Sequence, residues 1–459
     1  MEPAMEFARF TSRMDFNKIP QKTVDTVLKD ILDYFGNSLA GSNDKIVETV
    51  YNVISSFGGV EQSTVLTYKM KLPGVHAALI NGAMGTASDF EDTHEGANTH
   101  LGSACIPAAL AAAEINGNVG GSEFVVALTA AMEIGARIGM FCGRLKPHHI
   151  MGGWDFAALH GSFTATIAAG RLLHLSETEL LNALGLAYHQ ISGNALPGIE
   201  GADTKVLGAG FAARNGLIAA IMAKNGLTGA HGIFGNNDFG LSAMYHGGAN
   251  VSEMTAKLGE TFHVDDLGFK PYPCCLMGHR HIDAVLELMH SSDIQEQDIV
   301  KIIVYVCTPV SVQLCEPREE KICPKNRMVA QFSLPWMLSC AVVRGKIGFS
   351  EFTQESLYDS ELMKMANRVE TIVDQKLKNE RESAKIVVRT TNESFETQTK
   401  DFYGSPGNPM DWIALENKFR ENAKQCRKSL TSEKVERGIV LIKKLPDIPN
   451  IGAITEVFS

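Results

Sequence analysis

The first 265 residues consist almost entirely of segments whose apolar residues recur at the spacing of an α-helix. The clearest lies at 24–41, where valine, leucine, isoleucine and phenylalanine repeat every three or four positions and a glycine ends the run. Further segments of this kind lie at 75–87, 105–115, 123–141, 162–175, 177–192 and 212–225. Because so many apolar helix faces must be buried against one another, this part of the chain predicts a large helical domain.

The pattern changes after residue 265. Runs rich in β-branched residues at 299–307 and 385–389, and a weaker alternating run at 394–399, predict strands. Helical patterns surround them at 279–289, 329–343 and 356–369, and helix returns at 412–430 and 435–444 after a linker-like segment at 402–411. We therefore expect a mostly α protein: a helical domain over residues 1–265, an α+β domain over 266–404, and a return to the helical domain over 405–459.

Composition excludes several classes of function. The formal net charge of −10 and the pI near 5.8 disfavour a nucleic-acid partner, because sequence-independent binding to phosphates needs a basic face. No stretch reaches the roughly 18 uninterrupted apolar residues of a membrane span. We therefore expect neither a nucleic-acid nor a membrane partner.

Cysteine usage indicates the compartment. The chain has nine cysteines, an odd number, without a Cys-x-x-Cys pair, and its N-terminus lacks the basic-then-apolar pattern of a secretion signal. We expect a reducing, cytoplasmic setting. No glycine-rich nucleotide-binding fingerprint follows a predicted strand, so we expect no organic cofactor.

Residues 88–103 form a polar segment between two helical segments rich in small apolar residues. Its titratable residues are Asp89, Glu91, Asp92, His94, Glu95 and His100. Titratable groups at the edge of an apolar interior acquire shifted pKa values, which acid and base catalysts require. We interpret this acidic loop as the first half of an active site. Two alternatives are a solvated turn and a metal site, although no fixed ligand spacing supports a metal, and we expect none.

Two lysines stand near predicted helix starts. Lys205 precedes a glycine-rich helix start, and a helix N-terminus attracts anions, so this lysine would suit a substrate carboxylate. Lys270 is followed by a rigid Pro-x-Pro and then by His279. The alternatives are an ordinary surface lysine and a structural histidine. The adjacent Cys274 and Cys275 lack the separation that chelation of a metal needs.

Several segments in this order resemble the MmgE/PrpD family, whose members include 2-methylcitrate dehydratase, cis-aconitate decarboxylase and iminodisuccinate epimerase. The residues that carry the resemblance are Asp89-Phe-Glu-Asp-Thr93 with His100, Gly153-Trp154, Thr204-Lys205, Phe211-Ala-Ala-Arg-Asn-Gly216, Phe269-Lys270 with His279, and Asn408-Pro-Met410. The resemblance covers nearly the whole chain. It implies a large helical domain built from both chain ends, a smaller α+β lid, a homodimer, and an active site in the cleft between the domains.

The resemblance also implies site residues. Asp89, Thr93 and His100 match the family's acidic-loop residues, Lys205 its helical-domain lysine, and Lys270 and His279 its lid residues. We expect the lysines to bind substrate carboxylates, His100 and Asp89 to move protons, Thr93 to hydrogen-bond the substrate, and His279 to close the lid side.

One position departs from the family pattern. Similar proteins have histidine after the Gly-Trp pair, and in the decarboxylase branch it belongs to the active site, whereas here Asp155 follows Trp154. The tyrosine associated with decarboxylases also has no counterpart around Gln313. These differences disfavour decarboxylation, and Asp155 could act as a base where relatives carry imidazole.

We therefore expect a cofactor-independent lyase or isomerase that acts at the carbon alpha to a carboxylate of a small di- or tricarboxylic acid. The favoured activity is that of a 2-methylcitrate dehydratase-like hydro-lyase, and decarboxylase-like or epimerase-like activity on the same fold is the alternative. Two alternatives of other classes are a metal-dependent hydrolase built on the acidic loop and a helical scaffold whose catalytic site has decayed.

Overall fold

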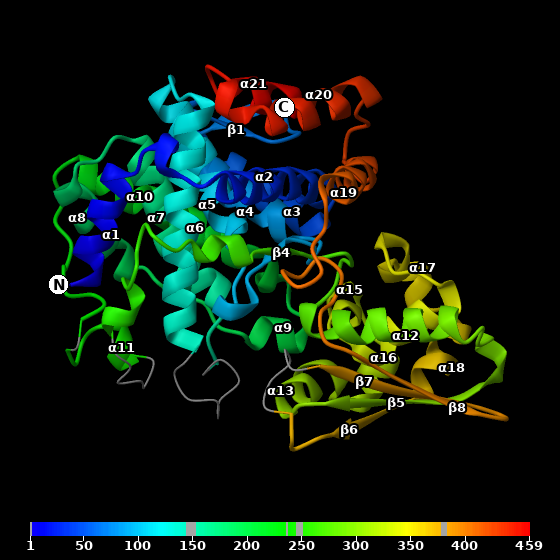
Figure 1. The fold of residues 1–459 in the computed structure, drawn as a ribbon. Helices are drawn as coiled ribbons and strands as arrows, with labels where there is room; N and C mark the ends of the chain where they lie inside the picture. The colour runs from blue at the N-terminus through cyan, green and yellow to red at the C-terminus, as the bar shows by residue number, and fades with distance from the viewer. Residues whose placement is uncertain (1, 144–152, 236, 245–250, 378–382) are drawn as a thin grey trace. The chain divides into compact units, whose positions relative to one another are not determined.

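The computed structural model describes residues 2–143, 153–235, 237–244, 251–377 and 383–459. It is mostly α-helical, as the sequence predicts (Figure 1). The chain forms two compact units. The helical unit comprises Met1–Ala195, Val206–Phe269 and Asp411–Ser459, and the sheet unit comprises Leu196–Lys205 and Lys270–Met410.

The helical unit contains nearly all of the helices predicted in the first half of the chain. Its helices are α1 Pro3–Arg13, α2 Gln21–Gly41, α3 Lys45–Ser55, α4 Gly74–Thr86, α5 Gly102–Asn116, α6 Gly121–Gly143, α7 Phe156–Leu172, α8 Glu177–Tyr188, α10 Gly208–Lys224, α11 Leu241–Met244, α19 Trp412–Lys424, α20 Ser432–Lys443 and α21 Gly452–Val457. Short antiparallel strand pairs join β1 Ser63–Val65 to β2 Met70–Leu72 and β3 Asp92–Thr93 to β4 Gly268–Phe269.

Small residues let the central helices approach closely. Gly82 on α4 faces Gly210 on α10, and a Cβ added at Gly82 would lie 2.7 Å from the Gly210 Cα atom. A Cβ added at Gly210 would lie 2.4 Å from the Leu79 carbonyl oxygen. Because side chains at these positions would force the helices apart, the alanine- and glycine-rich composition of these segments is explained by packing.

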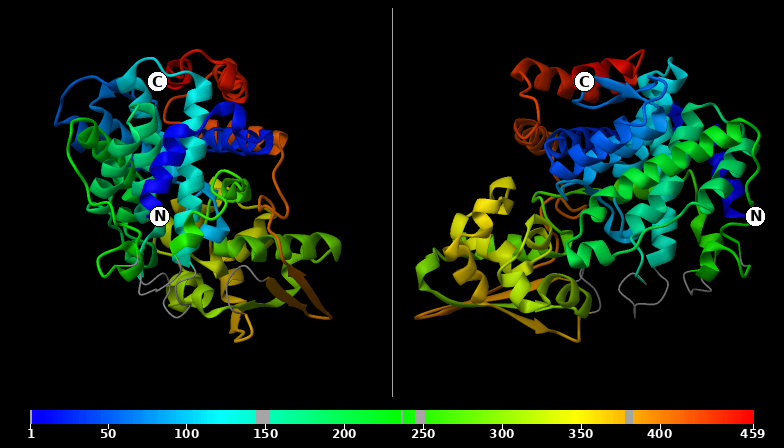
Figure 2. Two further views of the ribbon diagram at one scale, coloured as in Figure 1. Left: turned by 60° about the vertical axis from the view of Figure 1, so that its left-hand side comes forward. Right: turned by 180° about the vertical axis from the view of Figure 1, so that it is seen from behind.

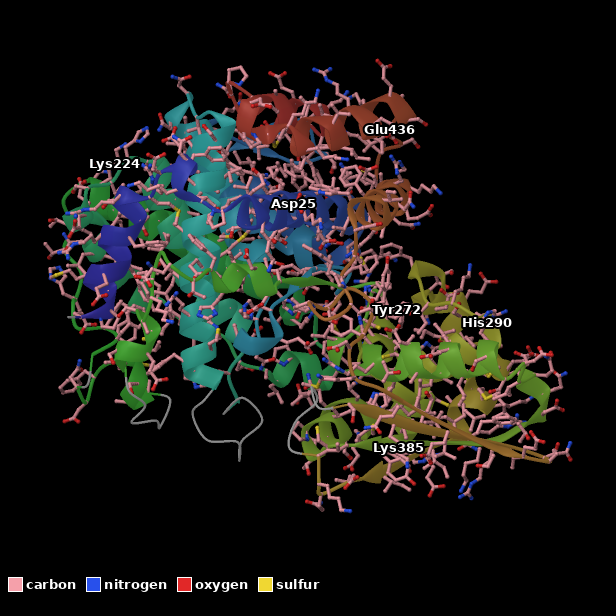
Figure 3. The ribbon with its side chains drawn as sticks, viewed as in Figure 1. Asp25, Lys224, Tyr272, His290, Lys385 and Glu436 are labelled. Atoms are coloured by element: carbon pink, nitrogen blue, oxygen red, sulfur yellow. The ribbon has the colours of Figure 1, made fainter. Side chains whose placement is uncertain are left out.

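The C-terminal helices pack on the N-terminal ones. In Figures 1 and 2 the helices α19, α20 and α21 lie beside the early helices of the chain. The Trp412 indole donates a hydrogen bond of 2.7 Å to Asp25, which Figure 3 labels on α2. Near the chain end, the Thr67 amide donates to the Phe458 carbonyl at 2.7 Å. The two chain ends therefore share one core.

Among the residues that the structure describes, two helical stretches have the length and hydropathy of a membrane span. They are Gly121–Cys142 and Asp203–Lys224, whose most apolar windows are 94% and 61% buried within the protein. Burial in the fold accounts for the apolar character of the first, since the central helix of a large core needs the same composition.

The sheet unit contains a four-stranded mixed sheet. Its order is β6 Val369–Val373, β5 Ile299–Val306, β7 Ala384–Thr390 and β8 Ser394–Thr399, with β5 and β6 parallel and the other pairs antiparallel. Helices α12 His279–Ser291, α16 Leu334–Arg344 and α18 Ser360–Asn367 lie along one face of this sheet (Figures 1 and 2). Its short helices are α9 Leu196–Glu200, α13 Thr308–Val310, α14 Arg318–Ile322, α15 Arg327–Gln331 and α17 Gln354–Leu357.

Some predicted elements are wrong in detail. The helix predicted over 329–343 is two helices, because the Ser333 side chain accepts a hydrogen bond from the Trp336 amide and starts α16 anew, with Pro335 in its first turn. The helix predicted over 356–369 is α17 followed by α18, and the next residues form β6, which the sequence analysis missed.

Candidate active site

The acidic loop connects α4 to α5, and its first half, residues 88–94, is buried. Asp89, Glu91, Asp92 and Thr93 are each 2 to 3% exposed, so the alternative of a solvated turn is wrong. Asp89 has a positive φ of 53°, a conformation that L-residues seldom adopt and that turns the chain sharply after α4.

A strand pair fixes the middle of the loop. Asp92 and Thr93 form β3, which pairs with Phe269 and Gly268 of β4 in an antiparallel register. The backbone that carries Thr93 is therefore held by a segment more than a hundred residues away in the sequence.

His100 is oriented by hydrogen bonding. Its Nδ1 lies 2.5 Å from the Asp92 carbonyl oxygen, and a carbonyl can only accept, so Nδ1 carries the proton. The other nitrogen, Nε2, lies 3.6 Å from the Glu91 carboxylate, and the imidazole is 25% exposed. A histidine with one nitrogen fixed and the other beside a carboxylate in a partly open position is suited to proton transfer.

The Asp92 carboxylate binds the start of α5. It accepts hydrogen bonds from the amides of Leu101 at 2.7 Å and Gly102 at 3.2 Å. Burial raises the pKa of Asp92 to about 7, the backbone amides oppose this rise, and the nearby carboxyls of Asp33 and Glu91 add to it. The expectation that this loop holds groups with shifted pKa values is therefore supported at Asp92.

Two buried carboxyls on α2 face the acidic loop, and sequence reasoning missed both. Burial raises the pKa of Asp30 well above its usual range, with further contributions from the carboxyls of Asp92 and Asp33. Burial also raises the pKa of Asp33, although Lys418 on α19 opposes this rise with an ion pair of 2.6 Å. The only signal in the sequence was the presence of two acids inside an apolar helical run.

His94 has a structural role. Its Nδ1 accepts from the Ala97 amide at 3.0 Å, and its Nε2 lies 2.9 Å from the His263 carbonyl, to which it donates. Burial lowers the pKa of His94, so the ring is neutral and shapes the turn before His100.

Asp155 begins helix α7. Its Oδ1 accepts hydrogen bonds from the amides of Ala157 at 3.0 Å and Ala158 at 3.3 Å, which is the geometry of an N-cap. Its role as a base remains a prediction. The nearby His160 is fully buried within α7, and burial lowers its pKa to about 3, so this histidine stays neutral at ordinary pH.

The sheet unit holds the other three predicted site residues, including Lys205, which the family resemblance had placed in the helical domain. Lys205 is half-buried, with its Nζ 5.3 Å from the centre of the Phe332 ring. Lys270 is 1% exposed. His279 is buried at the start of α12, and its Nε2 lies 3.1 Å from the Cys274 carbonyl.

An aromatic contact and a hydrogen bond to a carboxylate hold the segment that follows Lys270. Tyr272, labelled in Figure 3, meets the His279 ring edge-on at 5.3 Å and donates a hydrogen bond of 2.7 Å to Asp283. The segment that carries Lys270 is thereby fixed to α12.

No group of three or more histidine, cysteine, aspartate or glutamate side chains is arranged to hold a metal ion within the ranges that the structure describes. The predicted site residues form two sets. The helical unit contains Asp89, Thr93, His100 and Asp155, and the sheet unit contains Lys205, Lys270 and His279.

Comparison with known proteins identifies the family. The MmgE/PrpD N-terminal domain matches residues 5–254, and the MmgE/PrpD C-terminal domain matches residues 272–446. The chain therefore belongs to the MmgE/PrpD family.

Similar curated proteins are named for one activity. The cis-aconitate decarboxylase of Aspergillus terreus is 26% identical over 383 residues, which is 79% of this chain and 77% of that protein. The cis-aconitate decarboxylase of Homo sapiens is 24% identical over 486 residues, with 99% of this chain and 94% of that protein covered. These relatives are enzymes, and a decarboxylase is a lyase.

Proposed function

We propose that the protein is a lyase acting at a carbon next to a carboxylate of a small di- or tricarboxylic acid, with decarboxylation of cis-aconitate or a close analogue as its first candidate reaction. Family membership and the similarity to named decarboxylases support this proposal. The observation that carries it is the orientation of His100, whose Nε2 lies beside the buried Glu91 carboxylate.

The chemistry calls for a proton donor and fixed positive charge. In decarboxylation, the bond from a carbon to its carboxylate breaks, carbon dioxide leaves, and the electron pair passes to a carbon that then takes up a proton. We assign delivery of that proton to protonated His100, which becomes neutral and regains its proton from solvent. We assign to Lys205 and Lys270 the binding of the remaining carboxylates, and to Thr93 a hydrogen bond to the substrate.

Dehydration remains a second candidate because of Asp155. The position after Trp154 carries a carboxylate in place of imidazole, and that carboxylate caps α7 through Oδ1. A site with one imidazole fewer has less capacity to protonate carbon, whereas a carboxylate can serve as base in the loss of water. 2-Methylcitrate and citrate are the corresponding substrates.

One experiment separates these reactions. The pure protein is incubated in deuterated water with cis-aconitate, 2-methylcitrate, citrate and iminodisuccinate in separate samples, and each is followed by NMR. Loss of carbon dioxide with deuterium in the product supports the first candidate, and loss of water supports the second. Inversion or deuterium exchange without net loss indicates an epimerase. If no acid reacts or exchanges, the substrate class is wrong.

We also propose that the protein functions as a homodimer in a reducing compartment such as the cytoplasm. The family resemblance supports the dimer, and all nine cysteines are free thiols. Sedimentation equilibrium at micromolar concentration tests the dimer, and a monomer at all concentrations would exclude it.

A further inference from the structure

A buried lysine from the C-terminal segment contacts the acidic loop. Lys418 on α19 is 9% exposed, and its Nζ donates a hydrogen bond of 2.7 Å to the Phe90 carbonyl oxygen, 328 residues earlier in the chain. The same ammonium group lies 3.9 Å from the centre of the Phe90 ring. Phe90 precedes Glu91, so this contact fixes the peptide bond that joins Phe90 to Glu91.

A second donor binds the same carbonyl. The Asn37 side-chain amide on α2 donates to the Phe90 oxygen at 3.2 Å and to the Asp33 carboxylate at 2.9 Å. Asn422, one turn after Lys418 on α19, donates to the Asn37 side-chain oxygen at 3.0 Å. The Phe90 carbonyl is therefore held by side chains from two helices that also hold each other.

Lys418 also supplies positive charge among buried acids. It forms an ion pair of 2.6 Å with Asp33 and acts electrostatically on Asp30, both from α2. The groups that face this cluster from the loop are Glu91 and Asp92, and Cys105 faces it from α5. His100 lies beside Glu91. An uncompensated set of buried carboxylates would be unfavourable, so the lysine makes a conformation with acids in the interior stable.

We propose that Lys418 is a positioning residue of the active site, which holds the Phe90 carbonyl and Asp33 so that Glu91 and His100 keep the geometry needed for proton transfer. This inference rests on the proposed function, since it concerns the same acidic loop. It makes the C-terminal helix α19 part of the catalytic apparatus without contact with the substrate. A residue of this kind affects the rate because small displacements of catalytic groups are costly.

The test uses four variants of the full chain. Lys418→Met removes the charge and both hydrogen-bonding contacts, and Lys418→Arg keeps a charged donor. The double variant Lys418→Met with Asp33→Asn removes both partners of the buried ion pair, so that the fold is not left with an unpaired buried acid. Lys424→Met, on the same helix but with a side chain 65% exposed, is the matched control.

Two readouts are measured. The first is kcat and KM as a function of pH with the acid that the wild type converts. The second is the ring-carbon NMR resonance of His100 in protein with labelled histidine, assigned by its loss in His100→Gln, which needs no substrate.

We expect Lys418→Met and the double variant to lower kcat at least about tenfold with KM nearly unchanged. In Lys418→Met, which keeps the Asp33 carboxylate, we also expect the acidic limb of the pH profile to move to higher pH, since loss of a cation favours protonation of nearby acids. The His100 resonance should shift, Lys418→Arg should restore much of the rate, and Lys424→Met should match the wild type.

A folded double variant with the wild-type kcat and the wild-type His100 resonance would overturn the inference. So would a fall in rate that follows only the amount of folded protein. If the wild type converts none of the acids, the proposed function fails. The His100 resonance still shows whether Lys418 fixes the geometry of the acidic loop around His100.

Discussion

The Glu91 carboxylate lies 3.6 Å from the Nε2 atom of His100, whose other ring nitrogen donates to the Asp92 carbonyl. Glu91 is 2% exposed, and the His100 ring is 25% exposed. A buried acid therefore faces the one side of the imidazole that is not committed to the backbone. This pair is the reason for assigning proton transfer to the loop.

Lys205 is predicted to bind a substrate carboxylate. Lys205→Ala should lower kcat/KM by about 100-fold or more, because a fixed cation acts most strongly on the charge that develops in the transition state. Its thermal midpoint should stay near that of the wild type, since the side chain is half-buried and rests on Phe332. Steady-state kinetics and a thermal melt check both expectations.

The control for this variant is Lys224→Ala, an exposed position on α10 that Figure 3 labels. It should behave as the wild type. Equal turnover in Lys205→Ala and Lys224→Ala would remove Lys205 from the mechanism.

Asp30 should make stability depend on pH. Its pKa is raised in the folded protein, so the stabilisation that its protonated form contributes is complete below the unfolded pKa of about 3.9 and is lost as pH rises toward the folded pKa. Over that window this one group lowers the free energy of unfolding by up to about 1.4 kcal/mol per pH unit.

Asp30→Asn removes this titration. The free energy of unfolding of the variant, minus that of the wild type, should therefore be larger at pH 8 than at pH 5. Urea denaturation at both pH values measures this difference. A stability difference that is the same at the two pH values would show that Asp30 does not titrate differently in the folded and unfolded chain.

Asp155 should contribute to stability as a helix cap. Asp155→Ala should lower the free energy of unfolding by about 1 kcal/mol, because the amides of Ala157 and Ala158 lose their acceptor. Asp155→Asn should stay close to the wild type, since asparagine caps helices as well as aspartate does. Urea denaturation of the three proteins decides this, and an equal loss in both variants would contradict a capping role.

The same asparagine variant separates the two candidate reactions. If Asp155 serves only as a cap, Asp155→Asn keeps its turnover, whereas a base required for dehydration would make this variant lose it.

Periodicity in the sequence was sufficient to predict the helices around the site. The small apolar residues before and after the acidic loop do form the buried helices α4 and α5, and the run at 394–399 is strand β8. Local patterns report local structure, so these predictions needed no knowledge of distant contacts. The strand β6 was missed because its residues follow α18 directly and include polar ones.

The surroundings of the loop could not be predicted in the same way. Asp30 and Asp33 lie in a helix that is buried on nearly all sides. The helical spacing of its apolar residues gives no sign that these two acids are buried as well. Lys418 meets Phe90 across 328 residues, and neither position carries a local signal of that contact. Tertiary contacts of this kind determine pKa values and charge balance. The sequence therefore predicted the candidate catalytic residues of the loop, but not the buried charged residues that surround them.

In the proposed reaction, His100 moves a proton to or from a carbon next to a carboxylate. The most direct measurement is NMR of the wild type, His100→Gln and the exposed-histidine control His290→Gln, each incubated with the converted acid in deuterated water. We expect deuterium incorporation in the wild type and His290→Gln, and a rate lower by about 100-fold or more in a folded His100→Gln. Turnover in His100→Gln equal to that of the wild type would contradict it.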